Sequence, residues 1–302
     1  MALQPFQKPA LSLAAQLNLL QQRGMQIPDA GEAGHYLRFI GYYRLAGYWF
    51  PFQFRNGLQN HSHFMPGTNF PEVLDRYVFD RRLRVIVMDA VERIEVSARS
   101  TISNTMSEAY GPHWQIDSAN FEHGYNHQNF LNIMRRETGI SPANSQKQPA
   151  FVQHYLRKYN NPPDPPSWMV FECLSFGVVS KIFPKLPRQI QNNIAGMYGL
   201  PRGRLISWLH AISHIRNLCA HHSRVWNRTF GVAPSIDRQQ QHHIADPQKF
   251  YNQAVAIQTL LKRISGDTHW ANQLADLFAD YPGVPVLEMG FPLNWRQEAI
   301  WQ

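Results

Sequence analysis

Cysteine is nearly absent from this sequence. The 302 residues include only Cys173 and Cys219, and both fall inside apolar stretches with helical spacing. A disulfide scaffold or a thiolate metal cage requires several cysteines in a spaced framework. The composition therefore argues against both classes of protein, and we expect two reduced, buried thiols.

Long hydrophobic runs are also missing. No stretch of the sequence approaches the roughly 18 apolar residues of a membrane-spanning helix. The N-terminus lacks the basic region, apolar core and cleavage site of a secretory signal. We therefore expect a cytoplasmic protein with no membrane partner.

Acidic residues are fewer than basic ones. The chain has 21 Asp and Glu against 29 Lys and Arg, which gives a formal net charge of +8 with the 14 His counted as neutral. A basic surface favours polyanionic partners such as nucleic acid, although charge that serves only solubility has the same sign. Hydrophobic residues make up 44% of the chain, which is enough for a folded core.

The alternation of polar and apolar residues that is typical of strands is scarce, and helical patterns dominate. Neither Pro nor Gly occurs between positions 72 and 110, where apolar residues recur every three or four positions. The sequence predicts one long helix here, with Glu95 and Arg99 one turn apart on a charged face. Ion pairing on a solvated surface and a role beside a catalytic site both explain that face.

Short helices are expected on either side of this segment. Ser12 and Asp29 have the residue type and context of helix N-caps. Helical patterning returns at 247–264 and 271–278, and the residues from 281 onward are rich in Pro and Gly. About 65 residues form only a marginal core alone, so we interpret 1–235 as one domain and 236–302 as a helical extension.

The segment from Ser207 to Trp226 contains neither Pro nor Gly and is predicted to be a single helix. A turn of about 100° per residue places an apolar set on one face and a polar set on the opposite face. The apolar set is Trp208, Ile212, Ile215, Cys219 and Trp226; the polar set is His210, Ser213, His214, Asn217, His221 and Arg224. Imidazole, amide and guanidinium groups in one stripe indicate a site that faces a groove.

Within this stripe, Asn217 and His221 lie one helical turn apart, so the amide is placed to orient the imidazole. His222 points toward the apolar side, where we expect a structural histidine. Arg216 lies roughly 140° from His221 on a regular helix. Its long side chain, a local distortion or a second subunit must therefore close the gap.

The stretch from Arg216 to His221 matches the Arg-x4-6-His signature of HEPN ribonucleases, in which a polar residue follows the arginine. Residues 215–228 as a whole resemble the hallmark of the abortive-infection (Abi) family. Further similar blocks occur in the same order at 40–45 (IGYYRL), 77–84 and 174–177 (LSFG). The resemblance covers roughly residues 8–230.

This resemblance implies an all-α, HEPN-like helical bundle with N-terminal and C-terminal helical additions. It also implies a homodimer in which two motifs form one RNA-cutting cleft, and an activity in phage defence or as a toxin, with an antitoxin or RNA partner. Catalysis would use Arg216, Asn217 and His221 without a metal or cofactor. We expect His214, Arg224 and Arg228 to guide the RNA backbone, and Glu95 and Arg99 to support the motif.

Two other functions remain open at this point. His210 and His214 have the i, i+4 spacing of zinc ligands, but no Glu follows His210 and no third ligand is evident. A non-catalytic RNA-binding or regulatory HEPN protein would use the same arginines to hold phosphate.

Overall fold

The computed structural model describes residues 5, 9–54, 62–141, 148–236, 243–266 and 269–302. In these residues the regular structure is helical, and the only β pairing consists of two isolated bridges, Gln26 with Asn69 and Gln53 with Phe64. The predicted all-α class is confirmed. None of the helices in these ranges combines the length and the apolar character that crossing a membrane requires.

The first of two compact units comprises residues 1–83 and 276–285. It contains α1 (Leu13–Gln22), α2 (Ala30–Phe39), α3 (Tyr42–Trp49), the 3-10 helix η1 (Phe50–Phe52) and the first part of α4 (Phe70–Tyr110). The predicted caps are confirmed: the Ser12 side chain accepts a hydrogen bond from Ala15 N (3.2 Å), and Asp29 accepts one from Glu32 N (2.9 Å).

Aromatic residues of α3 build much of the core of this unit. Tyr48 and Trp49 are each only 2% exposed, and the Tyr48 hydroxyl donates a hydrogen bond to the buried Asp80 carboxylate at 2.6 Å. Phe79 stacks on Phe278 within the same unit. Tyr48 and Trp49 are therefore core residues, whereas Tyr43 of the same helix is 94% exposed.

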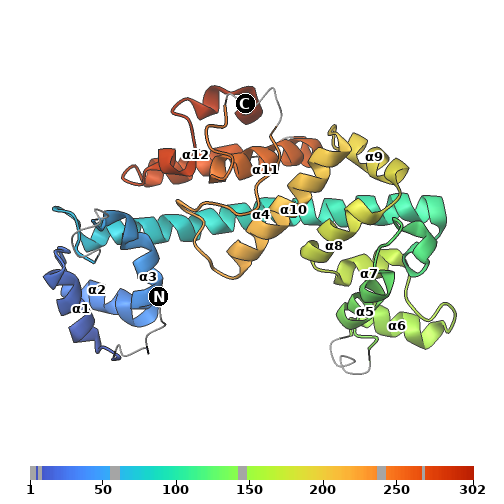
Figure 1. Cartoon of the computed structure of the whole chain (residues 1–302), viewed down its shortest axis with the longest axis horizontal. Helices are drawn as coiled ribbons and strands as arrows, with labels where there is room; N and C mark the ends of the chain where they lie inside the picture. Colours follow the sequence, from blue (N-terminus) through green and yellow to red (C-terminus); the bar gives the residue numbers. More distant parts are fainter. Residues whose placement is uncertain (1–4, 6–8, 55–61, 142–147, 237–242, 267–268) are drawn as a thin grey trace. The chain divides into compact units, whose positions relative to one another are not determined.

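The second unit comprises residues 84–275 and 286–302. It holds the rest of α4 and seven complete α-helices that the described ranges contain: α5 (His127–Glu137), α6 (Ala150–Lys158), α7 (Ser167–Cys173), α8 (Phe176–Ile182), α9 (Arg188–Met197), α10 (Arg202–Ala220) and α11 (Phe250–Ser265). The first part of α12 (Trp270–Asp280) also belongs to it. In this unit α10 crosses α4 and packs against α8, α9 and α11 (Figure 1).

The long helix α4 follows the prediction closely. It runs for 41 residues and is followed by Gly111, whose φ of +85° is unfavourable for other residues. The apolar residues that recur every three or four positions form a buried stripe: Leu83, Val87, Ala90 and Ile94 are at most 1% exposed. This buried stripe explains why a helix of this length is stable inside a globular protein.

The C-terminal segment packs into the second unit. Tyr251 on α11 is fully buried, and Trp301 makes ring contacts with Tyr251, Trp270 and Trp295. The indole Nε1 of Trp270 donates to Ile86 O on α4 at 2.9 Å. The predicted helices near 247–264 and 271–278 correspond to α11 and α12. The boundary between a domain at 1–235 and an extension at 236–302 stays a prediction. These contacts show that the segment packs into the unit, and they do not define the extent of a family domain.

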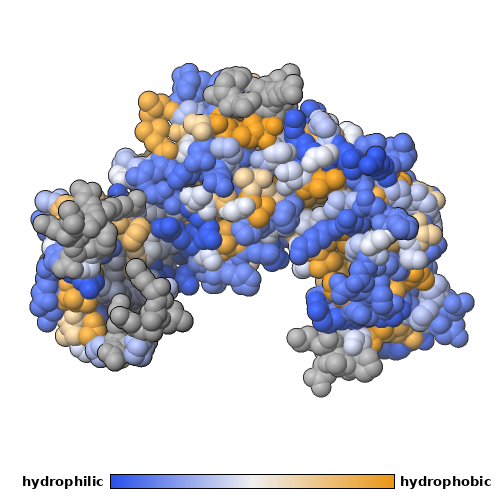
Figure 2. Space-filling view, in the orientation of Figure 1, coloured by the Kyte–Doolittle hydropathy of each residue, from blue (hydrophilic) through white to orange (hydrophobic). Residues whose placement is uncertain are grey.

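On the face of the molecule shown in Figure 2, hydrophilic residues predominate, and hydrophobic residues form small separate patches. Most large side chains of α10 and α11 do not contribute to such patches because they are buried. The exposed polar side chains of these helices are therefore the candidates for a functional role.

Candidate active site

The helix that carries the candidate site differs from the predicted one at both ends. Residues 207–226 were expected to be helical, whereas α10 runs from Arg202 to Ala220. Ser223 N donates to Leu218 O (2.8 Å) and His222 N donates to Cys219 O (3.0 Å), while His222 adopts a φ of +56°. These two bonds and the left-handed residue constitute a Schellman motif, which ends the helix and reverses the chain.

This turn corrects the expectation for His222. The helical wheel pointed its side chain toward the core, but His222 is exposed because it lies beyond the helix, where the wheel no longer applies. His221, in contrast, is the C-cap residue and is exposed as predicted. The structure thus presents the His221 imidazole at the very end of α10.

The left-handed conformation at His222 leads to a stability prediction. A non-glycine residue in this conformation costs about 1–2 kcal/mol. Glycine relieves that cost but loses more conformational entropy when the chain folds. His222→Gly should therefore raise the free energy of unfolding by about 1 kcal/mol. Urea denaturation measures this change. Ala220→Gly, inside the exposed last turn of α10, should instead lower stability by about 1 kcal/mol. Destabilisation by both substitutions would contradict the assignment of strain to His222.

The polar face of α10 is only partly as predicted. His210, Asn217 and His221 are exposed, and His214 is half-buried. Ser213 is 5% exposed and donates a hydrogen bond to His210 O (2.8 Å), and it also bonds to Ser180 of α8 (3.2 Å). Ser213 is therefore a packing residue, because α8 covers its side of the helix, and it does not belong to the site.

The opposite face of the helix is buried as predicted. Trp208, Ile212, Ile215 and Cys219 are at most 3% exposed, and so is Trp226 beyond the helix. Cys219 and Cys173 are both free thiols as expected, but only Cys219 is buried, because Cys173 is partly exposed. Burial raises the pKa of Cys173 to about 11, so this thiol stays protonated and is a poor nucleophile.

The guanidinium of Arg216 is held by a carboxylate of α4. Its Nε donates to Glu95 Oε2 at 3.4 Å, and Arg99 Nη2 donates to Glu95 Oε1 at 2.5 Å. Arg99 Nη2 also donates to Leu174 O at 2.8 Å. The predicted proximity of Glu95, Arg99 and Arg216 is confirmed, while their part in catalysis stays a prediction.

Burial gives this cluster its energetic importance. The Glu95 side chain is only 9% exposed, and burying a carboxylate costs free energy unless positive partners lie close to it. Two guanidinium groups supply that charge. About a third of the Arg216 side chain (32%) remains exposed, so Glu95 fixes its direction without removing it from solvent.

Of the three residues expected to guide RNA, His214 and Arg228 lie close together. Burial lowers the pKa of His214, and its electrostatic interactions with Arg228 and His210 lower it further. Arg228 therefore lies near His214 of α10, and Arg228 Nη1 also donates to Arg224 O at 3.3 Å. At neutral pH His214 is therefore uncharged, and the guanidinium of Arg228 supplies positive charge beside it.

The predicted contact between the Asn217 amide and the His221 ring is not formed in the described part of the chain. The hydrogen bond that joins this pair is His221 N to Asn217 O, a backbone contact of 3.0 Å. Side-chain bonds in a catalytic centre often tighten only when substrate is bound. The role of Asn217 thus stays a prediction.

Sequence reasoning missed contacts that hold the turn after His221. Asn227 has a φ of +45°, its amide donates to Glu288 in η6 (Val286–Met289), and its side-chain oxygen accepts from Lys249 Nζ at 3.4 Å. The partners lie 22 and 61 positions away, so no local pattern could indicate them. The one available clue was the residue type, because Asn tolerates a positive φ better than most residues.

The described residues contain no group of three or more His, Cys, Asp or Glu side chains that could hold a metal ion. The hypothetical zinc pair of His210 and His214 thus has no third protein ligand within those residues. The groups that the site does offer are an exposed imidazole, an oriented guanidinium and two further arginines. They suit proton transfer and the binding of phosphate.

The fold and this cluster define an all-helical protein with a surface site of imidazole and guanidinium groups at the end of one helix. Residues 35–227 match the family model described as Abi-like protein, and the match spans more than half of the 302 residues. The chain belongs to this family. Comparisons with curated proteins and with solved structures gave no match.

Proposed function

We propose that this protein is a metal-independent endoribonuclease of the HEPN type that acts in the cytoplasm, in abortive-infection defence or as a toxin. One observation carries the proposal. The exposed His221 imidazole lies at the end of α10, and Arg216 of the same helix has its guanidinium oriented by Glu95 of α4. The family description Abi-like and the formal charge of +8 support the same conclusion.

The proposed reaction is transesterification within the RNA chain. His221 accepts the proton of a ribose 2′-hydroxyl, and the oxygen attacks the adjacent phosphorus as the bond to the 5′ oxygen breaks. The products are a 2′,3′-cyclic phosphate and a 5′-hydroxyl, whose oxygen takes a proton from water while His221 returns its own proton to the solvent. Arg216 stabilises the additional negative charge on the phosphate in the transition state. Asn217 would help to orient the reacting groups, and His214, Arg224 and Arg228 would hold the backbone.

A non-catalytic RNA-binding protein is the alternative function. The Arg228 guanidinium beside a neutral His214 favours it, because this group binds phosphate without a reaction. The two functions differ at His221, since only cleavage requires a group that transfers a proton. Measuring cleavage and RNA affinity on the same His221 variant separates them.

We expect the active form to be a homodimer. Arg216 and His221 are five positions apart, which places them about 140° apart on a helix, and Arg216 is directed to α4 by Glu95. A second copy would bring another Arg216 to each His221. Light scattering on the active protein measures its mass. A strictly monomeric protein that cuts RNA at full rate would rule out this arrangement, and an antitoxin or RNA partner would appear as additional bound mass.

Metal chelation should leave the activity unchanged. In the proposed mechanism the phosphate charge is stabilised by Arg216, so EDTA removes nothing that the reaction needs. The test incubates the purified protein with total cellular RNA, with and without EDTA, and follows the loss of full-length RNA. Cleavage that stops in EDTA and returns with added Zn²⁺ would instead support the hydrolase based on His210 and His214.

A further inference from the structure

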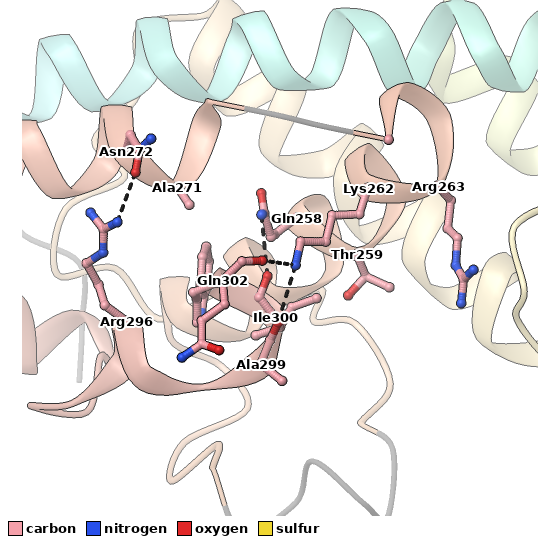
Figure 3. Close-up of a pocket in the computed structure, with 12 residues that line it drawn as sticks. Gln258, Thr259, Lys262, Arg263, Ala271, Asn272, Arg296, Ala299, Ile300 and Gln302 are labelled. Carbon is pink, nitrogen blue, oxygen red and sulfur yellow. Dashed lines mark hydrogen bonds between the residues drawn. The ribbon is translucent and has the colours of Figure 1, made fainter.

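The charged side chains of the open pocket beside the C-terminal segment make contacts within the chain. Lys262 Nζ donates to Gln302 O at 2.5 Å. Arg296 Nη2 donates to Asn272 Oδ1 at 2.9 Å. The two bonds lie apart in Figure 3, and Arg263 is directed away from both. These cations hold the C-terminal segment against α11 and α12, and they do not converge on one point.

The first unit carries exposed groups of another kind, which are aromatic. Phe39 at the end of α2 is 72% exposed, Tyr43 on α3 is 94% exposed, and Phe50 directly after α3 is 56% exposed. Scattered exposed apolar side chains are common, whereas several within one short segment form a patch that calls for a partner. We call these three residues the aromatic surface. No step of the proposed RNA cleavage uses them.

The exposure of Tyr43 does not result from a loosely packed helix. Its neighbour Tyr42 packs on Trp49 with ring centroids 4.8 Å apart, and the Tyr42 hydroxyl accepts a hydrogen bond from Arg23 Nη1 at 3.0 Å. Leu45 on the same helix is fully buried. These contacts fix the rotation of α3, so the fold holds the Tyr43 ring in solvent.

Tyr43 and Phe50 lie on one face of the helix. Phe50 keeps a helical backbone, with φ of −52° and ψ of −38°, so the spacing of α3 continues to it. Seven residues bring the two side chains within about 20° of the same direction and about 10.5 Å apart along the axis. Gly47 lies between them, and a Cβ atom built on it would meet no other atom within 4 Å. Bases stacked at about 3.4 Å can occupy the space between the two rings.

The charge of this segment has one sign. Neither Asp nor Glu occurs between positions 33 and 71 of the sequence. Arg38 and Arg44 are exposed, and each adjoins a residue of the aromatic surface. Aromatic rings that stack on bases, together with arginines that bind phosphate, are the groups that recognise single-stranded nucleic acid. The positive charge favours such a polyanion over an apolar protein partner.

We propose that the aromatic surface binds unpaired nucleotides of a single strand, with bases stacked on Tyr43 and Phe50 and phosphates near Arg38 and Arg44. That the strand is RNA rests on the proposed function, because stacking does not read the 2′-hydroxyl. The protein thus holds its RNA through residues other than those that cut it.

Fluorescence anisotropy on the full chain tests this proposal. The probe is a short, labelled single-stranded RNA whose 2′-hydroxyls are methylated, so that it cannot be cut. Tyr43→Ala should weaken binding about tenfold, the usual loss for one stacked base, and Tyr43→Trp should restore it. The control is Tyr110→Ala, which removes an exposed tyrosine near Glu108 at the end of α4 and should bind the probe normally.

Two further measurements separate stacking from other kinds of binding. A duplex of the same sequence should bind with no dependence on Tyr43, because its bases are already stacked on one another. Arg38→Gln should reduce the slope of log affinity against log salt by about 0.7, the value for one phosphate of a single strand. Equal effects of Tyr43→Ala and Tyr110→Ala, or equal dependence on Tyr43 for duplex and single strand, would overturn the proposal. So would a loss of assembled mass in Tyr43→Ala with unchanged RNA affinity, which would assign the surface to a protein contact.

Crosslinking on the unaltered protein locates the bound strand directly. Irradiation with a single-stranded oligomer that contains 4-thiouridine should attach it to the peptide that carries Tyr43 and Phe50, as read by mass spectrometry. Crosslinks confined to α10 would overturn the proposal. Binding that depends on Tyr43 in a protein that never cuts RNA would refute the nuclease and leave this surface standing. Cleavage that requires His221, with RNA affinity unchanged in Tyr43→Ala, would do the reverse.

Discussion

His221→Ala is expected to abolish RNA cleavage, with a loss of roughly 10²- to 10⁴-fold in rate, the usual contribution of a group that transfers a proton. RNA affinity should stay close to that of the unaltered protein, because the arginines that bind phosphate are unchanged. Stability should also change little, since His221 is exposed at the end of α10 and its backbone bonds persist in alanine. Cleavage is measured on a labelled RNA in single turnover, and affinity by fluorescence anisotropy.

The matched control for this experiment is His210→Ala. His210 is another exposed histidine on α10, about three turns before His221, and the proposed mechanism gives it no role. Its variant should cut RNA normally. If both variants cut RNA at the original rate, or if both lose activity equally, His221 has no special part in the reaction.

Glu95→Gln should produce the largest loss of stability among single substitutions at the site. Glu95 is the shared carboxylate of Arg99 and Arg216, and the neutral amide leaves two guanidinium groups close together without a counter-charge. Breaking a buried ion pair from one side costs roughly 3–5 kcal/mol, and we expect about 3 kcal/mol because Arg216 is partly exposed. Urea denaturation measures the change. The same variant should lower the cleavage rate, because Arg216 loses the contact that directs it.

Glu92→Gln is the control for this substitution. Glu92 is an exposed residue on α4, one turn before Glu95, and its loss should change stability by less than about 0.5 kcal/mol. A double-mutant cycle with Arg216→Gln then isolates the coupling between Glu95 and Arg216. Equal effects of Glu92→Gln and Glu95→Gln, or the absence of coupling, would show that the cluster is only an ordinary surface ion pair.

The elements that were predictable from the sequence are those whose causes are local. The long helix α4 follows from 41 positions with a single Pro near the start and a Gly just beyond the end. The side chains of Ser12 and Asp29 cap helices by accepting hydrogen bonds from backbone N–H groups three residues further on. Glu95 could be found because a charged residue on a helix that must be packed needs a partner. These features need no knowledge of distant contacts.

The end of α10 could not be predicted for an equally physical reason. The chain stops the helix with His222 in the left-handed conformation, a position that usually holds glycine, so no breaker marks the site. Extending the helix past Ala220 placed the His222 side chain toward the core, although it is exposed. The helical wheel also placed Ser213 on the polar face, because it takes no account of the packing of α8 against α10. Likewise, the contacts of Asn227 with Lys249 and Glu288 join positions far apart in the chain.

The chemistry of the RNA ends tests the central proposal most directly. The purified protein is incubated with cellular RNA in EDTA, and the newly formed ends are captured by a ligation that requires a 5′-hydroxyl and then sequenced. The proposed mechanism predicts new 5′-hydroxyl ends paired with 2′,3′-cyclic phosphates in the unaltered protein, and their absence in His221→Ala. New 5′-phosphate ends, or 5′-hydroxyl ends that persist without His221, would contradict it.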